Sequence, residues 1–125
     1  MQRAAHAAII KDGNILILLK KETWILPGGK IEDGESDIEC LCRELGEELP
    51  DTNFTVGVFY KSFSGITPNT RREITTNVYF VKVEGEVKDA AAEIKERKWV
   101  NNTNNYPLAD LTRMITDSLK KDGYL

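Results

Sequence analysis

The sequence predicts a mixed α/β (α+β) fold in which a mixed β-sheet is sandwiched between helices. Several segments show the residue types and two-residue alternation of strands, and two others repeat apolar residues at helical spacing. These segments follow one another as strand, strand, loop, helix, strand, strand, helix, an order that favours a mixed sheet between helices. With 125 residues the chain fits one core, so we expect a single domain over residues 1–125.

The first part of the chain predicts a hairpin followed by a glycine-rich break. Residues 4–10 and 14–20 predict two strands, and the Asp12-Gly13 pair between them is typical of a tight turn because glycine accepts positive φ. A short apolar patch follows at residues 24–26. The tripeptide Pro27-Gly28-Gly29 is expected to stop regular structure and to let the backbone approach another group closely.

The clearest predicted element is a helix that begins after Ser36. The stretch Ser36-Asp37-Ile38-Glu39 forms a capping box, in which the serine hydroxyl and the Glu39 carboxylate accept from each other's backbone amides. Pro50 ends this helix, because a residue before proline avoids the α region. Four apolar residues at helical spacing form its expected buried face: Ile38, Leu41, Leu45 and Leu49.

The second part of the chain predicts three strands and a last helix. Residues 54–62, 73–83 and 94–100 are the strand segments, whereas the polar stretch 63–72 and residues 84–92 predict loops. The asparagine-rich segment 101–105 predicts a turn. A helix is expected over residues 107–121, with an apolar side formed by Leu108, Leu111, Met114, Ile115 and Leu119.

Charge and cysteine content narrow the class of protein. The net charge of −3 does not favour a nucleic-acid polymer or a membrane surface as partner. The longest apolar run, residues 15–19, is too short to span a bilayer, and the N-terminus is typical of a strand and not of a signal peptide. Cys40 and Cys42 would point about 200° apart on a helix and cannot bridge each other. We therefore expect reduced thiols, no Cys-x-Cys metal site and a cytoplasmic location.

The helix carries an unusual acidic face. Glu44, Glu47 and Glu48 share an arc of about 100° that borders the apolar face. They repel one another at helical spacing, and they lie at the C-terminal end, where the helix dipole disfavours negative charge. Such an arrangement is also found on ordinary solvated helices, but next to a glycine pair it favours a divalent cation. Oxygen-only ligands indicate a hard ion such as Mg²⁺, or Mn²⁺ as a substitute.

The stretch from Gly29 to Asp51 resembles the Nudix box of the Nudix hydrolase family. That motif reads glycine, five residues, glutamate, seven residues, then Arg-Glu-U-x-Glu-Glu-x-Gly-U, where U is a bulky aliphatic residue. Seven defined positions match at the correct spacing: Gly29, Glu35, Arg43, Glu44, Leu45, Glu47 and Glu48. The end of the box departs from the pattern, because Pro50 and Asp51 stand where the family has glycine and an aliphatic residue. Proline cannot take the left-handed conformation of that glycine, so the chain must leave the helix differently.

The resemblance implies roles for individual residues. Members of the family hydrolyse a nucleoside diphosphate linked to another moiety, by metal-assisted attack of water on phosphorus. Carried over, the ions would be held by Glu44, Glu47, Glu48 and the Gly28 carbonyl. Arg43 would orient a glutamate, in the first place Glu44, or form a simple surface ion pair. Glu35 would brace the loop and helix through Arg43.

A later loop of such proteins often adds a ligand or a base. Glu93 is the first candidate here and Glu96 the second, although either could be merely solvated. The sole histidine, His6, lies on an apolar strand and is better explained as a core or edge residue. The general base is therefore expected to be a carboxylate, with Glu44 or Glu93 preferred.

The expected substrate contacts are less specific. Trp24 would either stack on a nucleobase or cap the sheet edge. Gly29 would line the substrate site. Arg71 and Arg72 would either reach phosphates or a sugar, or form a solvated loop tip.

Three functions compete on this reading. The first is a MutT-like pyrophosphohydrolase of a nucleoside triphosphate or related nucleotide, acting on a small-molecule substrate as a monomer or homodimer. The second is a pyrophosphatase of ADP-ribose or another nucleotide sugar, which the position of Pro68 after the box weakly favours and the short chain disfavours. The third is a Nudix-fold nucleotide-binding module without turnover, which loss of box carboxylates would mark, and none is lost.

Overall fold

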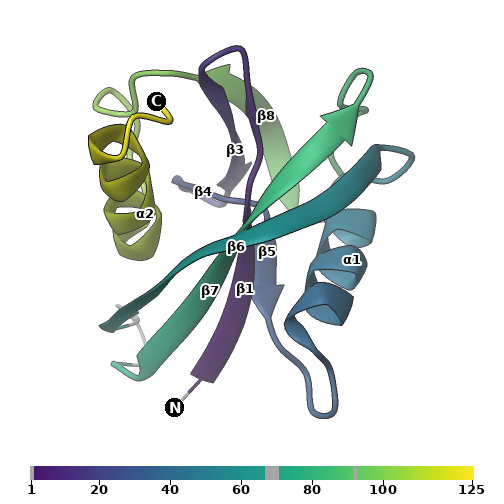
Figure 1. The fold of residues 1–125 in the computed structure, drawn as a ribbon, viewed down its shortest axis with the longest axis vertical. Coiled ribbons are helices and arrows are strands. Elements are labelled where there is room, and N and C mark those ends of the chain that lie inside the picture. Colours follow the sequence, from purple (N-terminus) through teal and green to yellow (C-terminus); the bar gives the residue numbers. More distant parts are fainter. Residues whose placement is uncertain (1, 67–70, 92) are drawn as a thin grey trace.

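A computed structural model describes residues 2–66, 71–91 and 93–125. In this part of the chain the strands form two four-stranded sheets. The two helices lie on opposite sides of the strands, with α1 (Asp37–Glu48) on the right of Figure 1 and α2 (Asp110–Lys121) on the left. Pro68 lies outside the described residues, so its predicted correspondence with other proteins stays untested. The mixed fold expected from the sequence is confirmed.

The first sheet is mixed because one of its strand pairs is parallel. Its order is β5 (Gly28–Lys30), β1 (Gln2–Ala8), β7 (Glu73–Glu84) and β6 (Asn53–Ile66). Strand β1 pairs antiparallel with β5 and parallel with β7, so its alanines lie between both neighbours and are buried. The register brings Gly28 opposite His6, and His6 opposite Val78. Strand β1 thereby holds Gly28 and Gly29 opposite His6 and Ala5.

The second sheet is built around β3 (Asn14–Lys20). This strand pairs with β2 (Ile10–Lys11), β4 (Thr23–Ile25) and β8 (Ile94–Val100), all in the antiparallel sense. Asp12 and Gly13 both have positive φ, 52° and 77°, which confirms the predicted tight turn. Residues 15–18 are fully buried, because successive side chains of β3 pack toward opposite helices.

Two apolar clusters join the sheets to the helices. The cluster on the α1 side includes Leu16, Leu18, Leu41, Leu45 and Leu49, and the cluster on the α2 side includes Ile15, Ile17, Trp24, Ile115 and Leu119. The capping box at Ser36 and Glu39 is present with both of its hydrogen bonds. Cys40 is buried and Cys42 exposed, and both are free thiols. Neither of the described helices is long and apolar enough to cross a membrane.

The first turn of α1 differs from the prediction. Ile38 is 42% exposed, although it was expected on the buried face. Asp37 faces the sheet in its place, since its Oδ2 accepts hydrogen bonds from Asn77 at 2.9 Å and from Tyr79 at 2.7 Å, both on β7. In α2, Met114 is likewise 43% exposed. Leu108 precedes that helix and forms a bridge with Trp24 of β4.

Two strand boundaries were also predicted wrongly. Pro27-Gly28-Gly29 was expected to stop regular structure, but both glycines belong to β5, which pairs with β1. Residues 63–66 were expected in a loop, but β6 continues to Ile66, which pairs with Glu73. A side chain at position 65 would press on Leu111 of α2, so the glycine there allows close packing of the helix and does not break the strand.

The end of α1 explains how the chain tolerates Pro50. Leu49 caps the helix with φ of −129° and ψ of 64°, outside the helical region, and Asp51 takes the left-handed conformation with φ of 61°. In the Nudix box the glycine stands where this chain has Pro50. Here the left-handed residue is Asp51, one position later. Leu49 is 1% exposed and Phe54 packs on the same cluster, so these residues supply the apolar contact that Asp51 cannot make.

Candidate active site

An acidic pocket of about 260 Å³ lies beside the C-terminal half of α1. Four glutamates line this pocket. Glu44, Glu47 and Glu48 come from α1, and Glu93 comes from the segment just before β8. Two contacts bring Glu93 to this place. The Ala91 amide donates to the Glu48 carbonyl at 2.9 Å, and Lys20 at the end of β3 pairs with Ile94. Lys20 and Ile94 complete the lining.

Glu48 is the most deeply buried acid of the pocket. It is 6% exposed, and its Oε1 accepts a hydrogen bond from the Gly28 amide at 2.9 Å. Burial raises the pKa of Glu48 to about 8, the Gly28 hydrogen bond lowers it in part, and the charge of Glu44 raises it further. A buried carboxylate with one neutral donor and two acidic neighbours is in the environment that a divalent cation would relieve.

The glycine pair makes room for two different neighbours. Gly28 has φ of 135°, and a Cβ atom there would collide with the Ala5 carbonyl oxygen of β1. At Gly29 a Cβ atom would lie 2.6 Å from the carboxyl carbon of Glu44. Gly28 is therefore required for packing on β1, whereas Gly29 leaves the space that the Glu44 carboxylate occupies. The role of the Gly28 carbonyl as a metal ligand stays a prediction.

Replacement of Gly29 by alanine should displace Glu44 without unfolding the protein. The φ of Gly29 is not positive, so alanine fits the backbone and the clash falls on the carboxylate alone. We expect kcat to fall about tenfold, while the melting temperature changes little. The matched control is Gly46→Ala in α1, where a Cβ atom meets nothing within 4 Å. That control should raise the free energy of unfolding by about 0.5–1 kcal/mol and leave kcat unchanged. Equal activity of the two variants would contradict the role of Gly29.

Arg43 joins the acidic pocket to the loop that precedes α1. Its guanidinium donates to both carboxylate oxygens of Glu35, at 2.8 and 3.0 Å, to Glu44 Oε1 at 2.9 Å and to the Lys30 carbonyl at 3.0 Å. These bonds lower the pKa of Glu35 to about 2 and raise that of Arg43. Arg43 thus makes the contact with Glu44 that an orienting role requires, and Glu35 makes the contact that a bracing role requires.

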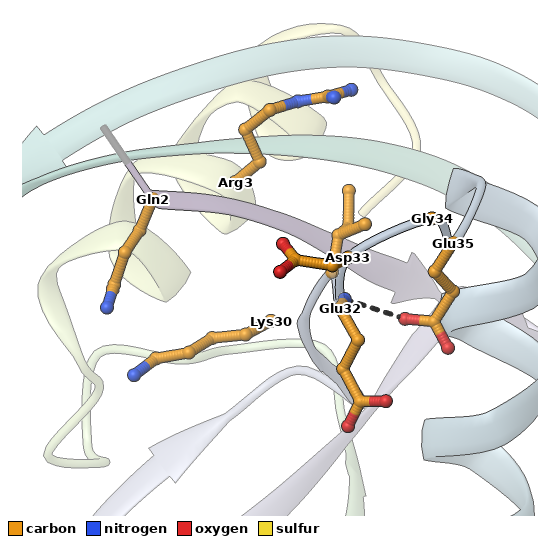
Figure 2. Close-up of a pocket in the computed structure, with 8 residues that line it drawn as sticks. Gln2, Arg3, Lys30, Glu32, Asp33, Gly34 and Glu35 are labelled. Atoms are coloured by element: carbon orange, nitrogen blue, oxygen red, sulfur yellow. Dashed lines mark hydrogen bonds between the residues drawn. The ribbon is translucent and has the colours of Figure 1, made fainter.

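A larger cavity of about 430 Å³ lies at the loop that carries Glu35 (Figure 2). Gln2 and Arg3 of β1 and the loop of residues 30–35 line it, and the Glu32 amide donates to Glu35 Oε1 at 2.9 Å within that loop. The three α1 glutamates do not line this cavity. Since Arg43 binds the Lys30 carbonyl and the Glu35 carboxylate as well as Glu44, the loop that forms the cavity and the acidic pocket share one support.

The acidic side chains of the pocket are bound by other residues of the chain. Glu44 binds Arg43, Glu48 binds the Gly28 amide, and Glu93 binds Lys20 at 3.0 Å. Accordingly, no three His, Cys, Asp or Glu side chains of the described residues are grouped as they would be around a metal ion. The donor set is nevertheless made of carboxylate oxygens, which Mg²⁺ and Mn²⁺ prefer. Arg43 binds Glu44 through Oε1, so the other oxygen of this carboxylate can serve a cation while Arg43 holds the side chain. Lys20, in contrast, places its positive charge directly against Glu93.

The structure does not bring every predicted residue to this pocket. Trp24 is 6% exposed and packs edge-on against Tyr106, with ring centroids 5.5 Å apart, so its ring is a core side chain and not a platform for a nucleobase. Arg71 and Arg72 are exposed and come just before β7. Gly28 lies at the level of Val78 in the sheet, which is about 20 Å further along the strand. None of these three residues lines the acidic pocket, and a substrate contact of Arg71 and Arg72 stays a prediction.

His6 and Glu96 also lie outside the pocket. His6 Nδ1 is 2.6 Å from the Thr76 hydroxyl, and burial lowers the pKa of His6 to about 4. This agrees with the expectation of a core or edge histidine. Glu96 pairs with Lys98 at 3.8 Å. Lys20, in contrast, was missed, although its position in the strand was informative: two residues after the buried Leu18, it lies on the face that packs toward α1.

Comparisons with known proteins find related sequences and similar folds. A family model described as NUDIX domain matches residues 1–115. The ADP-ribose pyrophosphatase of Methanocaldococcus jannaschii is 29% identical over 96% of this chain and 75% of its own length. A MutT-like protein of Streptomyces ambofaciens is 31% identical over 77% of this chain and 60% of its own length. The solution structure of the E. coli ORF135 protein superposes with a TM-score of 0.77 at 27% identity, and the match covers 98% of this chain and 93% of that one.

Proposed function

Because this chain belongs to the Nudix family, we propose that it is a hydrolase that cleaves a nucleoside diphosphate linked to another moiety. The observation that carries the proposal is the pocket in which Glu93 joins Glu44, Glu47 and Glu48 beside the glycine pair. Four carboxylates around one small pocket have no structural advantage of their own, since they repel one another. They suit a site for divalent cations and a polyphosphate.

We assign different roles to the residues of the pocket. Glu44, Glu47, Glu48 and Glu93, with the Gly28 carbonyl, would hold Mg²⁺, or Mn²⁺ as a substitute. A bound divalent cation offsets the charge of the diphosphate and lowers the pKa of water. Arg43 orients Glu44. Lys20 lowers the pKa of Glu93, so this carboxylate is ionised near neutral pH and can accept a proton from the attacking water, as can Glu44.

For the substrate we propose a nucleoside triphosphate or a related nucleotide. The MutT-like relative from Streptomyces ambofaciens supports this class. The second candidate is ADP-ribose or another nucleotide sugar, which the name of the Methanocaldococcus jannaschii relative favours. Both classes contain a diphosphate, so both suit the same acidic pocket.

The products of hydrolysis separate these candidates. The protein is incubated with Mg²⁺ and a panel of ribo- and deoxyribonucleoside triphosphates, ADP-ribose and nucleotide sugars, and products are separated by anion-exchange chromatography. We expect a nucleoside monophosphate and pyrophosphate from at least one triphosphate. AMP and ribose 5-phosphate from ADP-ribose alone would establish the second candidate. If nucleotides bind and none is cleaved, the protein is a binding module and the proposal is wrong.

A further inference from the structure

Lys20 places a positive charge inside the acidic pocket. It lines the pocket together with four glutamates, and its Nζ lies 3.0 Å from Glu93 Oε2. The Lys20 side chain is 42% exposed and that of Glu93 is 72% exposed, so the ion pair stands at the open side of the pocket. An exposed pair of this kind contributes little to stability. Its place among the predicted metal ligands indicates a functional role.

The backbone around Lys20 is irregular in a way that directs both partners to the pocket. Strand β3 pairs with β8 in regular register from Ile15 to Leu19, but Leu19 faces Glu96 whereas Lys20 faces Ile94. One residue of β8 is therefore skipped between them, which is a β-bulge. Bulges re-aim side chains and are frequent next to active sites. Here the bulge lies between the Leu19–Glu96 pair and the Lys20–Ile94 pair, next to the residue that follows Glu93.

Cation binding would change the partner of Lys20. The Lys20 ammonium lies 3.0 Å from Glu93 Oε2, so a divalent cation at either oxygen of this carboxylate would lie close to it, and two positive charges at one carboxylate repel each other. Once Glu93 turns, the ammonium stays at the mouth of a pocket that then holds the cation and the diphosphate. A phosphate oxygen is the anion that enters the pocket with the substrate, and lysine is a common phosphate ligand.

We propose that Lys20 is a substrate-positioning residue that holds Glu93 until the cation binds and then binds a phosphate oxygen of the diphosphate. This inference rests on the proposed function. If Lys20 has this role, its removal should change the affinity for the cation and the affinity for the diphosphate in opposite directions. A purely structural role would not have this effect. Lys20 competes with the cation, so its removal should tighten cation binding. Lys20 also supports the diphosphate, so its removal should weaken diphosphate binding.

The test compares Lys20→Met with Lys82→Met, which changes an exposed lysine of β7 that does not line the pocket. Affinity for Mn²⁺ alone is measured by electron paramagnetic resonance. Affinity for methylenediphosphonate, a diphosphate that cannot be hydrolysed, is then measured by calorimetry at saturating Mn²⁺. For Lys20→Met we expect Mn²⁺ to bind about tenfold more tightly and the diphosphonate about tenfold more weakly. The Lys82→Met protein should match wild type in both.

A second variant assigns the effect to the pair. In a Glu93→Gln background, Lys20→Met should no longer tighten Mn²⁺ binding, because the competing ion pair is already absent. If Lys20→Met changes neither affinity, or weakens both, while wild type binds Mn²⁺ and Glu48→Gln abolishes that binding, the inference alone is wrong. If wild type binds no Mn²⁺, the inference and the metal site of the proposed function fail together.

Discussion

Replacement of Glu48 by glutamine should abolish metal-dependent turnover and, without metal, stabilise the protein at alkaline pH. Glutamine keeps an oxygen that accepts from the Gly28 amide, so the local hydrogen bond at 2.9 Å survives. It removes one charged ligand from the proposed cation site, for which we expect a loss of about 10³-fold in kcat. Stabilisation by Mg²⁺, measured as the rise in melting temperature, should disappear with it.

The stability gain follows from the raised pKa of Glu48. Its pKa is about 8 in the folded protein and 4.5 in the reference state. Between these values the folded state holds a proton that the unfolded state has released, so the free energy of unfolding falls as pH rises from 4.5 to 8. At pH 9 the ionised carboxylate costs roughly 3–5 kcal/mol, which Glu48→Gln should recover in large part. Chemical denaturation in chelator at pH 4 and pH 9 measures the difference.

The control for this experiment is Glu84→Gln, at an exposed glutamate that ends β7. It should follow wild type at both pH values and keep full activity. A Glu48→Gln protein that is less stable than wild type at pH 9, or that still turns over with Mg²⁺, would contradict the assignment of Glu48 as a buried metal ligand.

Replacement of Arg43 by alanine should damage activity and acid stability together. The guanidinium holds Glu35 with two bonds and Glu44 with one, so its loss frees the Glu44 carboxylate to leave its position. Loss of a residue that orients a metal ligand lowers activity by about 10–100-fold, and we expect the upper end because Arg43 also ties the Lys30 carbonyl. Arg43→Lys keeps the charge but loses the planar fork, and it should recover only part of the activity.

The acid limb of the stability curve tests the same network. The pKa of Glu35 lies near 2 in the folded protein, below the reference value of 4.5, and its main cause is the hydrogen bond from Arg43. The stabilisation from this pair is therefore present above pH 4.5 and is lost as pH falls toward 2. In Arg43→Ala that fall should be smaller than in wild type. An unchanged acid limb with unchanged kcat would show that Arg43 is a simple surface ion pair.

The sequence was most informative where one residue type has one physical use. The Asp12-Gly13 turn, the capping box at Ser36 and the apolar residues of α1 from Leu41 onward are read from local rules, and the structure has all of them. The acidic face of α1 was placed correctly beside the buried face, since Glu48 is buried next to Leu45 and Leu49. Motif spacing then gave the family.

The misplaced residues depend on partners that are distant in the chain. Ile38 is exposed because Asn77 and Tyr79 bind the neighbouring Asp37, and no pattern within the helix shows that contact. Gly28 and Gly29 join a sheet because β1 offers an open edge. Trp24 is covered by Tyr106 and by the segment before α2, to which its backbone is hydrogen-bonded.

Lys20 shows a different limit. Strand alternation puts it on the same face as Leu18, toward α1, but only the register of β8 shows that Glu93 lies within reach of its ammonium. The pairing of two exposed, oppositely charged residues 73 positions apart cannot be read from either segment alone. A sequence can therefore indicate the single residues of a site built from several elements. The contacts between those residues become known only from the structure.

We propose that carboxylates of α1 hold a divalent cation beside the Gly28 backbone. An anomalous difference map from a crystal of the wild-type protein grown with Mn²⁺ tests it most directly. We expect a peak within about 2.0–2.6 Å of carboxylate oxygens of Glu44 and Glu48. A fully occupied peak elsewhere, with no peak beside the carboxylates of Glu44 and Glu48, would contradict it.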